Sequence, residues 1–182
     1  MKRIILASGS PRRRELLAML GVEFEVFSLD TDEKNSEKLG NYAQRAAEIK
    51  AEAVYKKRKD GIILAADTIV CIDGNILGKP KDRADAENML KMLSGRVHSV
   101  YTGFCVIEDG KSEASFEKTD VYFKKITPEL LSWYMETNEW YDKAGAYGIQ
   151  GSGSLLIEKI DGDYFNVVGL PISRIFGEYI RL

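Results

Sequence analysis

Three arginines, Arg12, Arg13 and Arg14, follow a Ser-Gly-Ser-Pro turn at residues 8–11 and open a predicted helix. Positive charge at a helix N-terminus is unfavourable by about 0.3–1 kcal/mol per exposed residue, so local stability does not account for them. Unpaired backbone N–H groups, the helix dipole and guanidinium forks would together bind a polyanion, and phosphate is the expected ligand. The alternative is an ordinary helix start, capped by the serine-proline pair and followed by solvated arginines.

A second candidate, Asp67, ends the continuous apolar run Ile62–Ala66. Such a run is typical of a strand covered on both faces, and open α/β sheets bind ligands where their strands end. Asp67 is therefore expected at a ligand-facing strand terminus, where it could bind Mg²⁺ or activate water, with Thr68 adding a hydrogen bond. The alternative is an aspartate that only caps a turn.

Two lysines could compensate phosphate charge. Lys79 follows a glycine in a Lys-Pro-Lys turn, and Lys50 lies in an alanine-rich predicted helix near Arg45. Lysine-rich turns are usually solvated surface, and a helical lysine often extends along an apolar face with its ammonium in water.

The segment 143–151 contains three spaced glycines among small residues, which would let a ligand approach the backbone closely. A flexible loop is the alternative, although a mobile linker would not ordinarily contain Tyr147 and Ile149. Gln150 carries both a donor and an acceptor, so it could hydrogen-bond the edge of a base.

Several chemistries lose support because their motifs are absent. The chain has no GxxxxGK[ST] phosphate loop, no strand-linked GxGxxG and a single histidine, His98. A serine nucleophile is also disfavoured, because no His-Asp partnership can be established for Ser8. Cys71 and Cys105 lie in apolar runs without CxxC spacing, which favours buried thiols in a reducing compartment, the cytoplasm.

Composition sets the broad class of the protein. With 182 residues, 45% hydrophobic and 30% charged, the chain is expected to form one soluble domain over 1–182 that could divide into two lobes. A net charge of -2 argues against a general nucleic-acid binder. No segment approaches the apolar length that spans a bilayer, so no membrane partner is expected.

Residue patterns predict a mixed α/β fold with βα units and antiparallel hairpins. The expected elements are strands at 3–7, 24–28, 62–72 (interrupted at 67–68) and 76–77; helices at 12–20, 41–58, 82–93, 127–137 and from 171; a long loop at 30–40; and hairpins pairing 97–107 with 115–124 and 155–160 with 164–168.

Four motifs occurring in order closely resemble the Maf family of nucleoside triphosphate pyrophosphatases. They are LASGSPRR at 6–13, AADTIV at 65–70, LGKP at 77–80 and DKAGAYGIQG at 142–151. The resemblance covers nearly the whole chain. It implies a mixed sheet with flanking helices and a central nucleotide-binding cleft, as in Maf and inosine triphosphatase-like proteins.

The resemblance also implies an activity: a cytoplasmic, dimeric, divalent-metal-dependent hydrolase that converts a nucleoside triphosphate to the monophosphate and pyrophosphate. Magnesium or manganese is the expected metal. Asp67 would accept a proton, Arg12, Thr68 and Gln150 would govern substrate choice, and the motifs look like those of the dTTP and UTP branch.

Matching positions extend the expected site. It comprises Asp67, Lys50 and Lys79 as catalytic residues, Ser8, Arg12, Arg13, Thr68 and Gln150 as substrate-binding residues, and Glu33 with Asp67 as metal ligands. Two alternatives remain open: a regulatory nucleotide-binding protein linked to cell division, and a pyrophosphatase acting mainly on modified nucleotides.

Overall fold

The structure, a computed structural model, describes residues 2–181, which form two compact units. Unit 1 comprises residues 2–68, 102–117 and 169–181, and unit 2 comprises 69–101 and 118–168. Because the chain passes between the units four times, each unit is assembled from segments far apart in the sequence.

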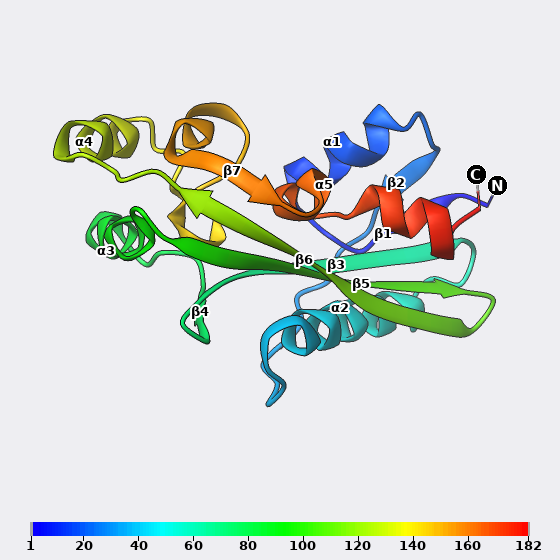
Figure 1. The fold of residues 1–182 in the computed structure, drawn as a ribbon. Helices are drawn as coiled ribbons and strands as arrows, with labels where there is room; N and C mark the ends of the chain where they lie inside the picture. Colours follow the sequence, from blue (N-terminus) through cyan, green and yellow to red (C-terminus); the bar gives the residue numbers. More distant parts are fainter. Residues whose placement is uncertain (1, 182) are drawn as a thin grey trace. The chain divides into compact units, whose positions relative to one another are not determined.

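Helices and strands are interspersed along the chain (Figure 1). The strands are β1 (Ile4–Leu6), β2 (Phe24–Val26), β3 (Ile62–Ile72), β4 (Asn75–Leu77), β5 (Val97–Glu108), β6 (Lys111–Phe123) and β7 (Ile157–Asp161). The helices are α1 (Pro11–Met19), α2 (Leu39–Tyr55), α3 (Arg83–Leu93), α4 (Pro128–Glu136), α5 (Tyr164–Val168) and α6 (Ile172–Arg174), with 3-10 turns η1 (Ala144–Ala146) and η2 (Gly151–Leu156) and a π-helical turn η3 (Ile175–Tyr179). Among residues 2–181, no helix combines the length and apolar character needed to cross a membrane.

The strands are hydrogen-bonded in the order β2-β1-β3-β5-β6-β7, with β4 on β3. Strand β1 runs parallel to both β2 and β3, whereas β3 with β4 and β6 with β7 are antiparallel. The predicted mixed sheet with flanking helices is therefore confirmed. The Asp109-Gly110 turn joining β5 to β6 has positive φ at both residues, as a type I′ hairpin turn requires.

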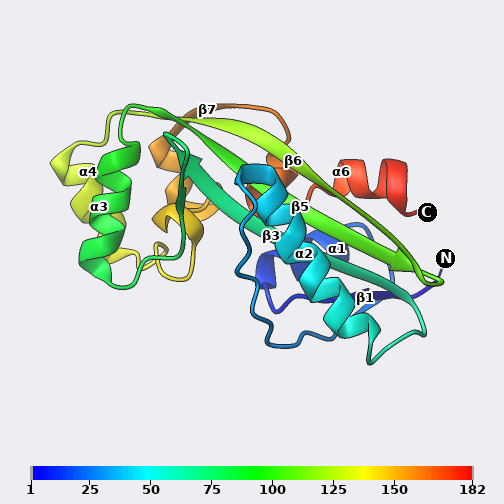
Figure 2. The same ribbon diagram turned by 90° about the horizontal axis from the view of Figure 1, so that it is seen from below.

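In unit 1, helices α1 and α2 lie on opposite faces of the strands (Figures 1 and 2). Small residues permit close packing on the α2 face: a Cβ at Gly103 of β5 would overlap the Ala43 backbone of α2. The next residue, Phe104, points to the other face and meets the Tyr179 ring edge-on at 5.0 Å. Successive side chains of β5 therefore face opposite sides of the sheet, one towards α2 and the next towards Tyr179.

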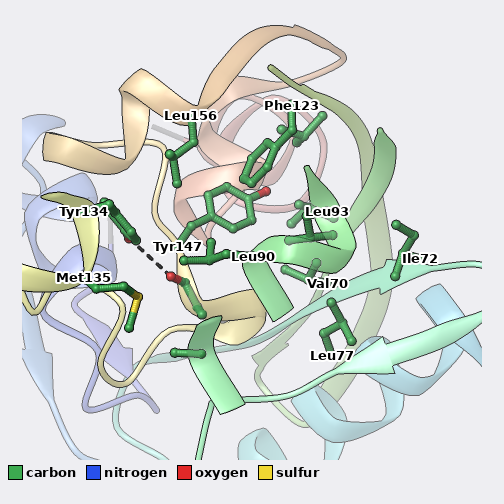
Figure 3. Packing of buried hydrophobic residues seen from close by; sticks show 14 residues of the cluster. Val70, Ile72, Leu77, Leu90, Leu93, Phe123, Tyr134, Met135, Tyr147 and Leu156 are labelled. Carbon is green, nitrogen blue, oxygen red and sulfur yellow. Dashed lines mark hydrogen bonds between the residues drawn. The ribbon is translucent and has the colours of Figure 1, made fainter. Parts of the chain in front are cut away.

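Unit 2 has a core in which helix α3 packs against α4 and the turn η1. Figure 3 shows the buried side chains of this core gathered around Tyr147. Asp82 caps α3 by accepting a hydrogen bond from the Asp85 N–H, and Thr127 caps α4 by accepting one from the Leu130 N–H. These two residues are the first of the helices predicted at 82–93 and 127–137.

One predicted hairpin is wrong. Residues 164–168 form helix α5 instead of a strand returning beside β7. The Asp163 side chain accepts a hydrogen bond from the Phe165 N–H, which supports a helical turn. Buried Asn166 then donates to the Val100 carbonyl and to Thr119 Oγ1, so tertiary hydrogen bonds override the β-branched and aromatic composition.

Candidate active site

Asp67 does not terminate a strand, contrary to the prediction. It is the sixth of the eleven residues of β3, and Thr68 continues the same strand. The predicted interruption at 67–68 is therefore wrong as well. Both side chains are only partly buried, although every residue on either side of the pair in β3 is buried.

The end of the neighbouring strand explains why β3 presents polar residues at this point. Parallel pairing between β1 and β3 stops at Leu6 with Leu64, and one further bond joins the Ala7 N–H to the Leu64 carbonyl. Asp67 thus lies beyond the carboxyl end of β1, where parallel sheets bind ligands. The prediction located the right end of a strand but assigned it to β3 instead of β1.

Lys50 joins the two carboxylates of the expected site. Its Nζ lies 2.7 Å from Asp67 Oδ1 and 3.3 Å from Glu33 Oε2. The side chains of Lys50 and Asp67 are 18% and 20% exposed, so water screens this pair only partly. Helix α2 positions Lys50, while Thr31 orients Glu33 by donating to its Oε1 at 2.6 Å.

The carboxylate pair fits a divalent cation. Among residues 2–181, no group of three or more His, Cys, Asp or Glu side chains could hold a metal ion. Magnesium, however, is usually bound by one or two carboxylates together with substrate phosphates. Glu33 and Asp67 supply that donor chemistry, and the Lys50 ammonium shared between them shows that positive charge is favourable at this point.

Arg13 is buried and contacts the same strand. Its Nε donates to the Gly169 carbonyl at 2.8 Å, Nη1 to Ser8 Oγ at 2.9 Å and Nη2 to Thr68 Oγ1 at 3.1 Å. The guanidinium therefore joins α1 to three segments of unit 1. This geometry gives Arg13 a positioning role, while direct contact with a substrate stays a prediction.

Burial lowers the pKa of Arg13 from its ordinary value, and the positive charge of Arg12 acts in the same direction. The carboxylates of Asp67 and Glu33 partly offset this effect. The shift leaves the guanidinium charged at neutral pH. Arg12 is half-buried and precedes Arg13 at the start of α1, where the Ser10 side chain makes no capping hydrogen bond.

Lys79 and Gln150 belong to unit 2. Lys79 is exposed and forms an ion pair with Asp142. The two segments that carry these residues are adjacent, because the Gly145 N–H donates to the Gly78 carbonyl at 3.1 Å. Gln150 is exposed and immediately precedes η2.

Sequence reasoning missed two partners in unit 1. Thr102 of β5 lies 2.9 Å from Thr68, oxygen to oxygen, and Gly169 receives the Arg13 hydrogen bond. Gly169 has φ 122°, a backbone conformation that residues with a Cβ rarely adopt. Glycine is therefore favoured at the position whose carbonyl accepts the Arg13 hydrogen bond. The Asn-Val-Val-Gly-Leu-Pro segment at 166–171 was the available signal, whereas nothing in the sequence marks Thr102.

Comparisons with known proteins agree with this architecture. A relative from Thermoanaerobacter sp. (strain X514) named dTTP/UTP pyrophosphatase is 53% identical over 178 residues, covering 96% of this chain and 93% of its own length. Proteins of the same name from Pyrococcus abyssi and Bacillus anthracis are 48% and 46% identical; each match covers 98% of this chain, and 95% and 94% of the relative.

Two solved structures share the fold. The Ham1 protein of Staphylococcus aureus superposes with a TM-score of 0.52 at 16% identity, covering 67% of this chain and 72% of that one. The Coxiella burnetii HAM1 protein gives 0.51 at 19%, covering 68% and 73%. A family model described as "Maf-like protein" matches residues 3–180, so the chain belongs to the Maf-like family.

Proposed function

We propose that this protein hydrolyses nucleoside triphosphates, with dTTP and UTP as its preferred substrates, to the nucleoside monophosphate and pyrophosphate. The names and near-full-length similarity of its relatives support the reaction. The observation that carries the assignment is the partly exposed Asp67 carboxylate, held 2.7 Å from Lys50 beyond the end of β1.

In this proposal Asp67 is the general base. Lys50 bonds Oδ1 and orients the carboxylate, so Oδ2 is assigned to the attacking water. The water oxygen forms a bond to the α-phosphorus as its proton passes to Asp67, and the bond from that phosphorus to the bridging oxygen breaks. Pyrophosphate leaves with that oxygen, giving the monophosphate as the second product.

Glu33 and Asp67 are the residues that would hold a divalent cation, magnesium or manganese. When bound, such an ion would neutralise phosphate charge and lower the pKa of the attacking water. Lys50 then compensates charge around both carboxylates, since its ammonium lies within 3.3 Å of each.

The remaining predicted residues are assigned to substrate recognition. Ser8 and Arg12, at the start of α1, are proposed to bind phosphate oxygens, and Lys79 to compensate the charge of the departing pyrophosphate. Thr68 and Gln150 are proposed to hydrogen-bond the pyrimidine, because hydroxyl and amide groups match its carbonyl and N–H groups.

A product-resolved screen tests the proposed function. Purified protein is incubated with Mg²⁺ or Mn²⁺ and each ordinary or modified triphosphate, and monophosphate, pyrophosphate and phosphate are quantified. Pyrophosphate release that is fastest with dTTP and UTP is the expected result. Release of phosphate alone would overturn the reaction, and binding without turnover would favour the regulatory nucleotide sensor. Faster cleavage of modified pyrimidines would reassign the substrate.

We further propose that the protein acts in the cytoplasm as a homodimer. Both cysteines, Cys71 and Cys105, are buried free thiols, which suits a reducing compartment. Light scattering of the purified protein should give twice the mass of the 20.4 kDa chain. A monomeric mass at the concentrations used for activity would contradict the dimer.

A further inference from the structure

A carboxylate that no sequence motif singles out holds the turn next to Gln150. Glu139 lies three residues beyond the end of α4. Its Oε1 accepts the Ser152 N–H at 3.1 Å, and its Oε2 accepts the Gly153 N–H at 3.2 Å. The two amides belong to the second and third residues after Gln150, so the carboxylate secures the backbone beside the proposed base-recognising side chain.

The surroundings of Glu139 are built for this contact. Gly151 has φ 65°, and a Cβ there would lie 2.8 Å from Glu139 Oε1, so a side chain at that position would obstruct the carboxylate. Burial raises the pKa of Glu139, but hydrogen bonds from Ser152 and Gly153 and the charge of Lys143 outweigh it, so the pKa lies below its usual value. The carboxylate is therefore ionised at neutral pH.

The other end of the loop is fixed independently in the core of unit 2. The Tyr134 hydroxyl donates to the Ala146 carbonyl at 3.2 Å, the bond drawn as a dashed line in Figure 3. Buried Tyr147 lies 2.6 Å from His98, oxygen to nitrogen. Gln150 consequently occupies a short span between a buried anchor at 146–147 and the Glu139 anchor at 152–153.

We propose that Glu139 is a positioning residue for base discrimination: it holds the turn that presents Gln150 to the pyrimidine. The inference rests on the proposed function and on the role assigned to Gln150 there. A side-chain amide distinguishes bases only when its donor and acceptor point in fixed directions, and a preorganised backbone provides that orientation. Losing one anchor would let the turn sample other conformations and weaken the distinction.

The test is a double-mutant cycle on substrate discrimination. The ratio of kcat/KM for UTP to kcat/KM for ATP is measured for wild type, Glu139→Gln, Gln150→Ala and the double variant. Glu139→Gln replaces one carboxylate oxygen with an amide NH₂ group, which donates and does not accept, so one backbone N–H loses its acceptor. Glu136→Gln is the matched control, because Glu136 is an exposed carboxylate on α4 that contacts Arg83.

Each single variant should lower the ratio about tenfold. The double variant should fall no further than the lower single variant, and the control should match wild type. Hydrogen exchange in the nucleotide-free protein should also be faster at Ser152 and Gly153 in Glu139→Gln than in the control.

The outcomes separate this inference from the proposed function. If wild type prefers UTP and Glu139→Gln keeps the wild-type ratio, the positioning role is overturned while the activity stands. Equal losses for UTP and ATP, or losses that multiply in the double variant, would also overturn it, because they indicate a general structural role. If wild type hydrolyses neither triphosphate, the proposed function fails first and the specificity role fails with it.

Discussion

At the scale of single residues, the proposed reaction depends on Asp67. Asp67→Asn keeps the size of the side chain but removes the charge that pairs with Lys50 and the capacity to accept a proton. We expect pyrophosphate release to fall by about 10²–10⁴-fold with nucleotide binding retained. Steady-state rates and equilibrium titration with UTP measure the two quantities.

Asp60→Asn is the control for that change, because Asp60 is an exposed carboxylate paired with Arg58 in the same unit. Its rate should equal that of wild type. Near-normal turnover by Asp67→Asn would remove the general-base assignment.

Arg13 illustrates a second residue-scale effect, in which shape matters more than charge. Lysine has one ammonium and cannot reproduce donation from three nitrogens to Gly169, Ser8 and Thr68. Arg13→Lys should therefore lower the free energy of unfolding by about 1–3 kcal/mol in urea titrations. Arg14→Lys, at the exposed neighbouring position, should change it by less than about 0.5 kcal/mol. Equal effects would mean that the buried hydrogen bonds contribute little.

At the scale of elements, the contact between α2 and β5 constrains the fold that positions Lys50. A Cβ at Gly103 would overlap backbone atoms of Ala43 and Gln44, which cannot move away as a flexible side chain would. Gly103→Ala should lower the free energy of unfolding by about 1–3 kcal/mol or more, measured by urea titration. Gly177→Ala meets nothing within 4 Å and should leave stability unchanged or raise it by about 0.5 kcal/mol. An unperturbed Gly103→Ala would show that α2 can shift.

Element prediction succeeded where local signals were strong. The caps Asp82 and Thr127 and the Asp109-Gly110 turn depend on residues within three positions of one another. It failed at 164–168, because the partners of Asn166 lie 47 and 66 residues away in the sequence. Local composition contains no information about hydrogen bonds over such separations.

At the scale of the whole molecule, stability should depend on the protonation of the only histidine. Burial lowers the pKa of His98 to about 4 from 6.5, with Asp120 opposing the shift, and its Nδ1 has no hydrogen-bond partner within residues 2–181. Between these pH values the unfolded chain binds the proton more tightly. Stability is therefore lost as pH falls from 6.5 towards 4, by about 3 kcal/mol in total.

Urea titrations at pH 7 and pH 5 measure this dependence. Wild type should lose about 2 kcal/mol of unfolding free energy between them through His98. His98→Gln should lose correspondingly less, whatever its stability at pH 7. The same loss in both proteins would assign the pH effect to carboxylates.

By itself, the sequence determined the class of the fold and the family, and it supplied the residues of the candidate site, because short motifs, local caps and alternation depend on neighbouring residues. Only the tertiary structure decided that Asp67 lies inside β3 beyond the end of β1, that Arg13 is buried and donates to Thr68, and that Glu139 accepts hydrogen bonds from the turn after Gln150. Those facts depend on where separate segments stop and meet, which hydrogen bonding and packing determine over the whole folded chain.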